Sequence, residues 1–147
     1  MTADRTTPLL SVEGLRVEYR TRRKDDRGRL VATAVDGVDL AVFPGETLAV
    51  VGESGSGKTS IANAVMRLID VAAGRIVFEG RDLVRLTKRE LRDVRPRIQM
   101  IFQDPFESLD PRLTVLDAVM EPLVINRIGA DANERRALAL EALRAAG

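Results

Sequence analysis

The amino-acid sequence predicts an α/β fold built around a glycine-rich loop, and three observations support this prediction. Residues 47–51, TLAVV, form a continuous apolar run, as expected of a parallel strand that is buried on both faces. The glycine-rich sequence GESGSGKTS follows at once, over residues 52–60. Apolar residues then recur at the spacing of one helix face, at Ile61, Ala64, Val65, Leu68 and Ile69. The order strand, loop, helix is the context that a phosphate-binding loop requires.

The composition of the 147-residue chain narrows the class of protein. With 45% hydrophobic and 31% charged residues it is typical of a soluble globular domain, and its formal net charge of +1 does not argue for nucleic-acid binding. Cysteine and histidine are absent, which removes the thiolate and imidazole metal ligands and the usual general base near neutral pH. No apolar run approaches the roughly 20 residues of a membrane span, and the N-terminus lacks the apolar core of a signal peptide. The predicted compartment is therefore the cytoplasm.

The segment before the apolar run predicts two strands joined by a charged loop. Apolar side chains alternate along residues 10–19, with an irregularity at Gly14. Residues 20–29 are dense in charge, and we interpret them as a solvated hairpin loop, the alternative being a patch for phosphate or acidic lipid. A second alternating strand covers residues 38–42 and stops before Pro44.

Shorter elements follow the glycine-rich loop. Residues 75–80 predict a strand and a turn, and residues 97–102 predict another strand. Thr87 and Glu90 have the spacing of a capping box, so a short helix is expected to begin there.

The C-terminal part of the sequence is helical in pattern. A helix is expected from Val115, interrupted at Pro122. A second helix is expected after Asp131, which is spaced with Glu134 as a cap.

Four positions of the loop match the phosphate-binding pattern G-x-x-x-x-G-K-[ST]: Gly52, Gly57, Lys58 and Thr59. The glycines let successive backbone N–H groups point at phosphate oxygens at the start of a helix. Lys58 supplies a positive charge to the β- and γ-phosphates, and the Thr59 hydroxyl is a ligand for Mg²⁺. A chance glycine-rich turn is the alternative, but the flanking strand and helix patterns favour nucleotide binding.

A second stretch decides which nucleotide-binding class fits. The sequence IQMIFQDPFESLDPRLTV over residues 98–115, with MEPL over 120–123, resembles an ABC transporter ATPase subunit of the oligopeptide/dipeptide importer branch, which also handles nickel and glutathione. The resemblance implies an incomplete ABC ATPase domain over 1–147. Its parts are an N-terminal antiparallel β subdomain at about 10–45, a P-loop NTPase core at 46–104, and the Q-loop with the start of a helical subdomain at 105–147.

The resemblance also assigns roles to individual residues. It implies that Lys58 and Gln103 are catalytic, that Thr59 and Gln103 bind Mg²⁺, and that the adenine of ATP stacks on Tyr19. The alternatives are that Gln103 is a polar residue ending a strand and that Tyr19 packs as an ordinary aromatic. The ATP-binding residues implied are Tyr19, Gly52, Glu53, Ser54, Gly55, Ser56, Gly57, Lys58, Thr59 and Ser60.

Other family motifs are absent from these residues: a Walker B strand with its carboxylates, an LSGGQ signature and a switch histidine. We therefore expect an N-terminal part of the domain that binds ATP without hydrolysing it alone. The implied partners are membrane permease subunits, a second ATPase subunit and, indirectly, an extracytoplasmic substrate-binding protein, with no nucleic acid. The implied location is peripheral, on the cytoplasmic face of the bacterial inner membrane.

Three alternatives to an importer ATPase differ in class. The first is a nucleotide-binding remnant or interaction module that holds ATP without cleaving it. An ABC-type ATPase of DNA repair or chromosome architecture is disfavoured by the near-neutral charge, the lack of zinc-type cysteines and the importer-like QDPFESLDPR. A GTPase is disfavoured because no N-K-x-D motif is present.

Overall fold

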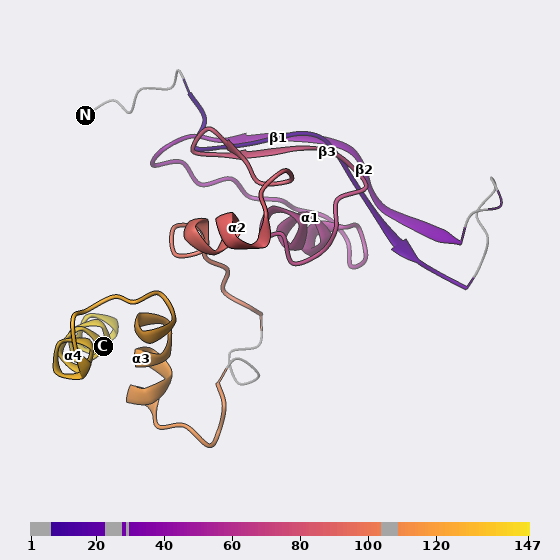
Figure 1. Ribbon diagram of the computed structural model, residues 1–147. Coiled ribbons are helices and arrows are strands. Elements are labelled where there is room, and N and C mark those ends of the chain that lie inside the picture. Colours follow the sequence, from indigo (N-terminus) through magenta and orange to yellow (C-terminus); the bar gives the residue numbers. More distant parts are fainter. Residues whose placement is uncertain (1–6, 23–27, 29, 104–108) are drawn as a thin grey trace. The chain divides into compact units, whose positions relative to one another are not determined.

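The structure, a computed structural model, describes residues 7–22, 28, 30–103 and 109–147 (Figure 1). It forms two compact units, Met1–Gln99 and Met100–Gly147. Most of the predicted charged loop and the DPFES portion of the polar stretch lie outside the described residues.

A four-stranded antiparallel sheet forms the frame of the first unit. Its strands are β1 (Leu10–Arg20), β2 (Val31–Val42), β3 (Ala73–Phe78) and β4 (Arg81–Asp82), in the order β2-β1-β3-β4. Every neighbouring pair is antiparallel. This sheet confirms the predicted N-terminal strands and the strand and turn after the loop.

Register shifts between β1 and β2 explain two features of these strands, an irregularity that was predicted and a strand start that was not. The irregularity at Gly14 is confirmed: its φ is 56°, and the β1–β2 register shifts between Val12 and Leu15, which keeps both of these side chains in the core. The second strand begins earlier than predicted. Its inward side chains Val35 and Val38 are three positions apart across a register shift, so strict alternation fails there.

Two helices cover one face of this sheet (Figure 1). Helix α1 (Lys58–Val65) contacts β1 and β2, and α2 (Lys88–Val94) contributes Val94 to the same core. The helices and strands share one set of buried side chains, namely Val12, Leu15, Val17, Val35, Ala64, Ile76, Phe78, Leu83 and Val94.

Helix α1 is shorter than its apolar spacing predicted. It ends at Val65, and Arg67 adopts a left-handed conformation with φ of 52°, so the helical path stops before Leu68. Leu68 is consequently 49% exposed, while Ile69 still packs against the core.

The predicted capping box of α2 is present. The Glu90 N–H donates to Thr87 Oγ1 at 3.3 Å, and the Thr87 N–H donates to Glu90 Oε2 at 2.8 Å. These two bonds satisfy backbone donors that the first turn leaves open, which fixes the start of the helix.

Two predicted strands are not formed among the described residues. Residues 47–51 and 97–102 belong to no sheet. Most of their apolar side chains face solvent, with Val51 90% and Ile101 96% exposed, although Ile98 packs against the core. A parallel strand needs a hydrogen-bonded neighbour, and none of the four described strands pairs with either segment. The parallel strand predicted over residues 47–51 and the strand predicted over residues 97–102 are therefore wrong for the described part of this chain.

The second unit contains α3 (Val115–Ile125) and α4 (Ala132–Ala146), which pack against each other. The predicted interruption at Pro122 is wrong, because α3 continues through this residue. The predicted cap of α4 is confirmed: Asp131 accepts a hydrogen bond from the Glu134 N–H at 2.9 Å. Among the described residues, no helix is both long and apolar enough to cross a membrane.

Candidate nucleotide-binding site

The glycine-rich loop links the exposed residues 47–51 to the first turn of α1. The Ser56 N–H donates to the Glu53 carbonyl oxygen at 3.2 Å and closes a turn. Gly55 has a φ of 80° and Gly57 a φ of 94°, in the left-handed region that glycine enters without a steric penalty. The sequence prediction that glycines shape this loop therefore has a direct conformational reason at two positions.

Gly57 also lies directly against the backbone of β2. A Cβ atom added at Gly57 would overlap the carbonyl oxygen of Ala34 and approach the Val35 side chain to 3.4 Å. No such neighbour exists at Gly55, where nothing lies within 4 Å of an added Cβ. Sequence reasoning missed the contribution of Ala34, because a backbone carbonyl leaves no signal in residue type.

The Lys58 ammonium group is bound by the loop itself. Its Nζ donates to the Gly52 carbonyl at 2.7 Å, to the Glu53 carbonyl at 2.5 Å and to Ser56 Oγ at 3.2 Å. Three acceptors match the three donors of an ammonium group. The positive charge is thereby held at the loop, and a phosphate oxygen that binds Lys58 has to replace one of these acceptors.

The first turn of α1 adds the partial positive charge of a helix N-terminus. Gly57 is its N-cap residue and has no side chain with which to cap the turn, and the Ile61 N–H donates to the Gly57 carbonyl at 2.9 Å. Thr59, in this turn, is exposed. Uncapped N–H groups and an accessible hydroxyl are what a phosphate with a bound cation uses.

Tyr19 lies beside this turn although it is distant in sequence. The Tyr19 hydroxyl at the end of β1 donates to Ser60 Oγ at 3.1 Å, and Tyr19 is 40% exposed. The structure thus brings together the loop and the predicted adenine-stacking residue. The contact between Tyr19 and Ser60 was not anticipated from the sequence, and stacking on adenine remains a prediction.

Gln103, the other predicted catalytic residue, is exposed and belongs to the second unit. Its role toward Mg²⁺ and the attacking water remains a prediction. Across residues 7–22, 28, 30–103 and 109–147, no group of three or more acidic, cysteine or histidine side chains is placed to hold a metal ion.

The loop geometry agrees with what sequence comparison finds. The family described as ABC transporter matches residues 35–147, which is most of the chain. The chain belongs to the ABC transporter ATP-binding family. Nucleotide binding and transport are properties of this family.

Curated relatives within this family have importer names. A putative peptide import ATP-binding protein of Brucella ovis is 47% identical over 137 residues, covering 92% of this chain and 41% of the relative. The glutathione import ATP-binding protein GsiA of Salmonella choleraesuis is 42% identical over 131 residues, covering 88% of this chain and 21% of the relative. The chain thus spans about two fifths or less of the length of these relatives.

Solved structures of the same fold confirm the predicted ABC ATPase architecture. A dimeric, post-hydrolysis state of the ATP-binding cassette MJ0796, bound to ADP and Pi, has a TM-score of 0.75 at 28% identity, over 92% of this chain and 56% of that chain. CbiO1 from Clostridium perfringens, part of an ABC transporter complex, has a TM-score of 0.71 over 93% of this chain and 49% of that chain. The fold class predicted from the sequence is that of ABC cassettes, although the strands predicted over residues 47–51 and 97–102 are not formed.

Proposed function

We propose that this chain supplies the ATP-binding loop of an ATPase subunit that energises a bacterial peptide-type importer. The observation that carries the proposal is the loop at residues 52–60, in which Lys58 is held by three loop oxygens at the uncapped start of α1. The 47% identity to a peptide import ATP-binding protein supports the transport process, because it extends over 92% of the chain.

In this function the loop binds and orients the triphosphate. Backbone N–H groups of the loop and of the first turn of α1 donate to phosphate oxygens, and Lys58 exchanges a loop acceptor for an oxygen of the β- or γ-phosphate. The Thr59 hydroxyl would hold Mg²⁺, which supplies charge neutralisation between the β- and γ-phosphates. Tyr19, next to Ser60, presents its ring to the nucleobase.

Gln103 completes the proposed chemistry as the residue that orients the attacking water. Its neutral amide can hold a water without adding negative charge beside a triphosphate. This role makes hydrolysis, and not ATP affinity, the quantity that depends on Gln103.

The proposed partners are those of an importer: membrane permease subunits, a second ATPase subunit and, indirectly, an extracytoplasmic substrate-binding protein. The dimeric state of the structural relative MJ0796 supports an ATPase pair. The proposed location is the cytoplasmic face of the bacterial inner membrane, where a peripheral subunit contacts the permease.

A second function is a nucleotide-binding module that holds ATP without hydrolysing it. The loop at residues 52–60 supports ATP binding in this alternative as it does in the first. Binding of ATP is common to both functions, and turnover separates them.

Titration with a fluorescent ATP analogue tests the binding step. Lys58→Ala should weaken binding about tenfold to a hundredfold, since hydrogen bonds to a charged group contribute about 1.5–3 kcal/mol. Arg89→Ala, an exposed cation on α2 outside the loop, is the matched control and should leave the affinity unchanged. Equal affinity of the wild type and Lys58→Ala would contradict the proposed site.

Turnover is measured with a partner ATPase subunit and permease present. Gln103→Ala should keep the affinity and slow hydrolysis or uncouple it from transport. Binding by the wild type with no turnover, even with these partners, would assign the chain to the non-hydrolysing alternative.

A further inference from the structure

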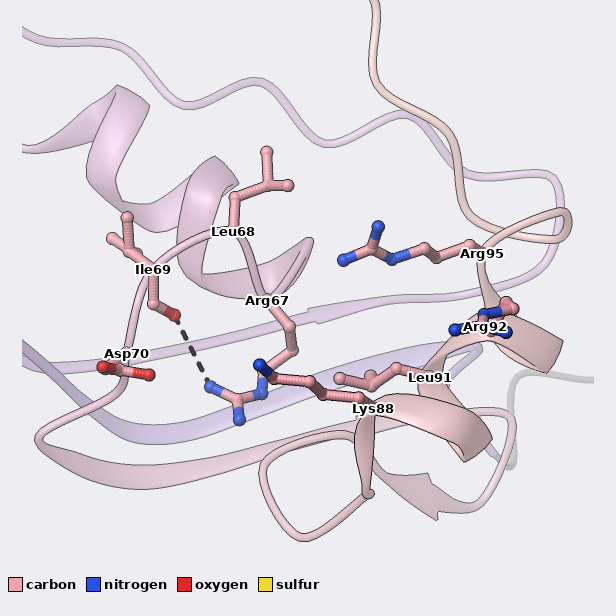
Figure 2. A pocket seen from close by; sticks show the side chains of 8 residues that line it. All are labelled: Arg67, Leu68, Ile69, Asp70, Lys88, Leu91, Arg92 and Arg95. Carbon is pink, nitrogen blue, oxygen red and sulfur yellow. Dashed lines mark hydrogen bonds between the residues drawn. The ribbon is translucent and has the colours of Figure 1, made fainter. Parts of the chain in front are cut away.

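A cationic cavity separate from the glycine-rich loop lies between the end of α1 and α2. It has a volume of about 430 Å³. Four of its lining side chains are cationic and one is a carboxylate: Arg67, Lys88, Arg92, Arg95 and Asp70. Figure 2 shows Lys88 of α2, and Arg95 directly after α2, extending toward the segment that follows α1. None of residues 52–60 lines this cavity.

The charges of α2 are separated between two faces of the helix. Lys88, Arg92 and Arg95 are at positions i, i+4 and i+7 and therefore share the face that lines the cavity. Glu90 and Asp93 fall on the opposite side of the helix by the same geometry. Arg92 and Arg95 lie at the C-terminal end of α2, where the helix dipole favours cations, whereas Lys88 lies in the first turn, where it does not.

The cations of α2 are not neutralised by carboxylates of the described chain. Within residues 7–22, 28, 30–103 and 109–147, no acidic side chain lies within 4.0 Å of the charged atoms of Lys88, Arg92 or Arg95. By contrast, Glu90 caps α2 through Thr87, and Asp82 in β4 pairs with Arg75 and Arg85. The cavity therefore carries an excess of positive charge.

Arg67 fixes one wall of the cavity. Its left-handed backbone, with φ of 52°, turns the chain at the end of α1. Its Nε donates to the Leu83 carbonyl at 3.1 Å and its Nη1 donates to the Ile69 carbonyl at 3.5 Å. These bonds use part of the guanidinium donor set and hold the rest of the group at the cavity (Figure 2).

We propose that this cavity binds the phosphate group of a phosphate monoester or of an anionic lipid headgroup. Guanidinium groups donate paired hydrogen bonds to phosphate oxygens, and Arg92 and Arg95 supply two of them from adjacent turns of one helix face. Leu68 and Leu91 line the same cavity and provide apolar contact for the organic part of the ligand. The volume is that of a small-molecule site, larger than a bare phosphate ion needs.

Hydrogen exchange read by mass spectrometry, with the whole chain at micromolar concentration, locates the site. The probe is glycerol 3-phosphate, which carries a phosphate monoester and no nucleobase. We expect slower exchange in peptides that cover residues 67–70 and 88–95. Protection confined to residues 52–60, or equal protection by sodium chloride at the same ionic strength, would overturn the proposal.

The variants separate this cavity from general surface charge. The triple variant Lys88→Gln, Arg92→Gln and Arg95→Gln should need at least about tenfold more glycerol 3-phosphate for half of the protection. Arg89→Gln changes the same charge on the same helix outside the cavity and should match the wild type. If the triple variant loses helical circular dichroism, Arg95→Gln alone decides, with an expected shift of about threefold. An unchanged titration in a folded variant would overturn the proposal.

Vesicle sedimentation distinguishes the two sources of phosphate. The vesicles are phosphatidylcholine with added phosphatidylglycerol. If the protein sediments with them, and if the triple variant loses this binding while Arg89→Gln keeps it, the cavity binds a lipid headgroup. Glycerol 3-phosphate binding without vesicle binding assigns it to a soluble ester. If the protein binds neither glycerol 3-phosphate nor the vesicles, the proposal is overturned. It is also overturned if a glutamate peptide of the same charge protects the cavity as well as glycerol 3-phosphate does, because the cavity would then bind an acidic protein segment.

Discussion

Substitution of Gly57 by alanine tests whether the glycine-rich loop depends on its contact with β2. The added Cβ would overlap the Ala34 carbonyl oxygen, a backbone atom that cannot rotate away. The residue would also keep a φ of 94°, which a non-glycine residue adopts only at a cost of about 1–2 kcal/mol. Overpacking against a fixed neighbour typically costs about 1–3 kcal/mol more. The expected loss of unfolding free energy is therefore about 2–5 kcal/mol.

Gly55→Ala is the matched control for this prediction. Gly55 has a similar φ of 80°, but nothing lies within 4 Å of an added Cβ, so only the conformational cost of about 1–2 kcal/mol remains. Urea unfolding followed by circular dichroism, together with titration of the ATP analogue, measures both variants. If Gly57→Ala is no less stable than Gly55→Ala, the packing of the loop on β2 does not determine its geometry.

Three further predictions concern other parts of the chain. Tyr19→Phe removes only the hydrogen bond to Ser60 and should cost about 0.5–1.5 kcal/mol of stability. Tyr19→Ala also removes the ring and should weaken binding of the ATP analogue by about 1–3 kcal/mol. Equal affinities of the two variants for the analogue would refute a stacking role. Hydrogen bonds from the side chain and backbone of Thr87 lower the pKa of Glu90 below its ordinary value of 4.5, so its stabilising effect is present above that pH and is lost as pH falls through the lowered pKa. Urea titrations across this acidic range should show a loss of unfolding free energy with falling pH in the wild type and not in Glu90→Gln. If the unfolding free energy of the two proteins depends on pH in the same way, the prediction is contradicted. Val51→Lys should raise the soluble fraction after expression and change stability by less than about 0.5 kcal/mol, because Val51 is 90% exposed; a larger destabilisation would show that the residue packs.

Local signals in the sequence predicted most of the elements correctly. The caps at Thr87 and Asp131 each depend on residues a few positions apart, and each is present. The irregularity at Gly14 is also present, signalled by the glycine itself, although its N–H donates to the distant Asp39 on β2. The phosphate-binding pattern likewise specified where α1 begins, at Lys58. The two caps are predictable because the side chain and its backbone partner are close in sequence.

Features that depend on distant partners were not predictable in the same way. The apolar runs at 47–51 and 97–102 have strand composition, but a strand forms only when a neighbour is present to pair with it. Apolar spacing placed Leu68 on α1, but the left-handed Arg67 ends the helical path first. The cationic cavity was also missed, because α2 was interpreted from its capping box and not from the charges on each face.

The start of α1 is attached to two adjacent strands of the sheet. Gly57 rests on the backbone of β2, and the Tyr19 hydroxyl of β1 is bonded to Ser60. A single attachment would leave the helix free to pivot, whereas two attachments on neighbouring strands define its direction. A twist of the β1–β2 hairpin would therefore be transmitted as a rotation of the first turn of α1, and the donors for phosphate would turn with it.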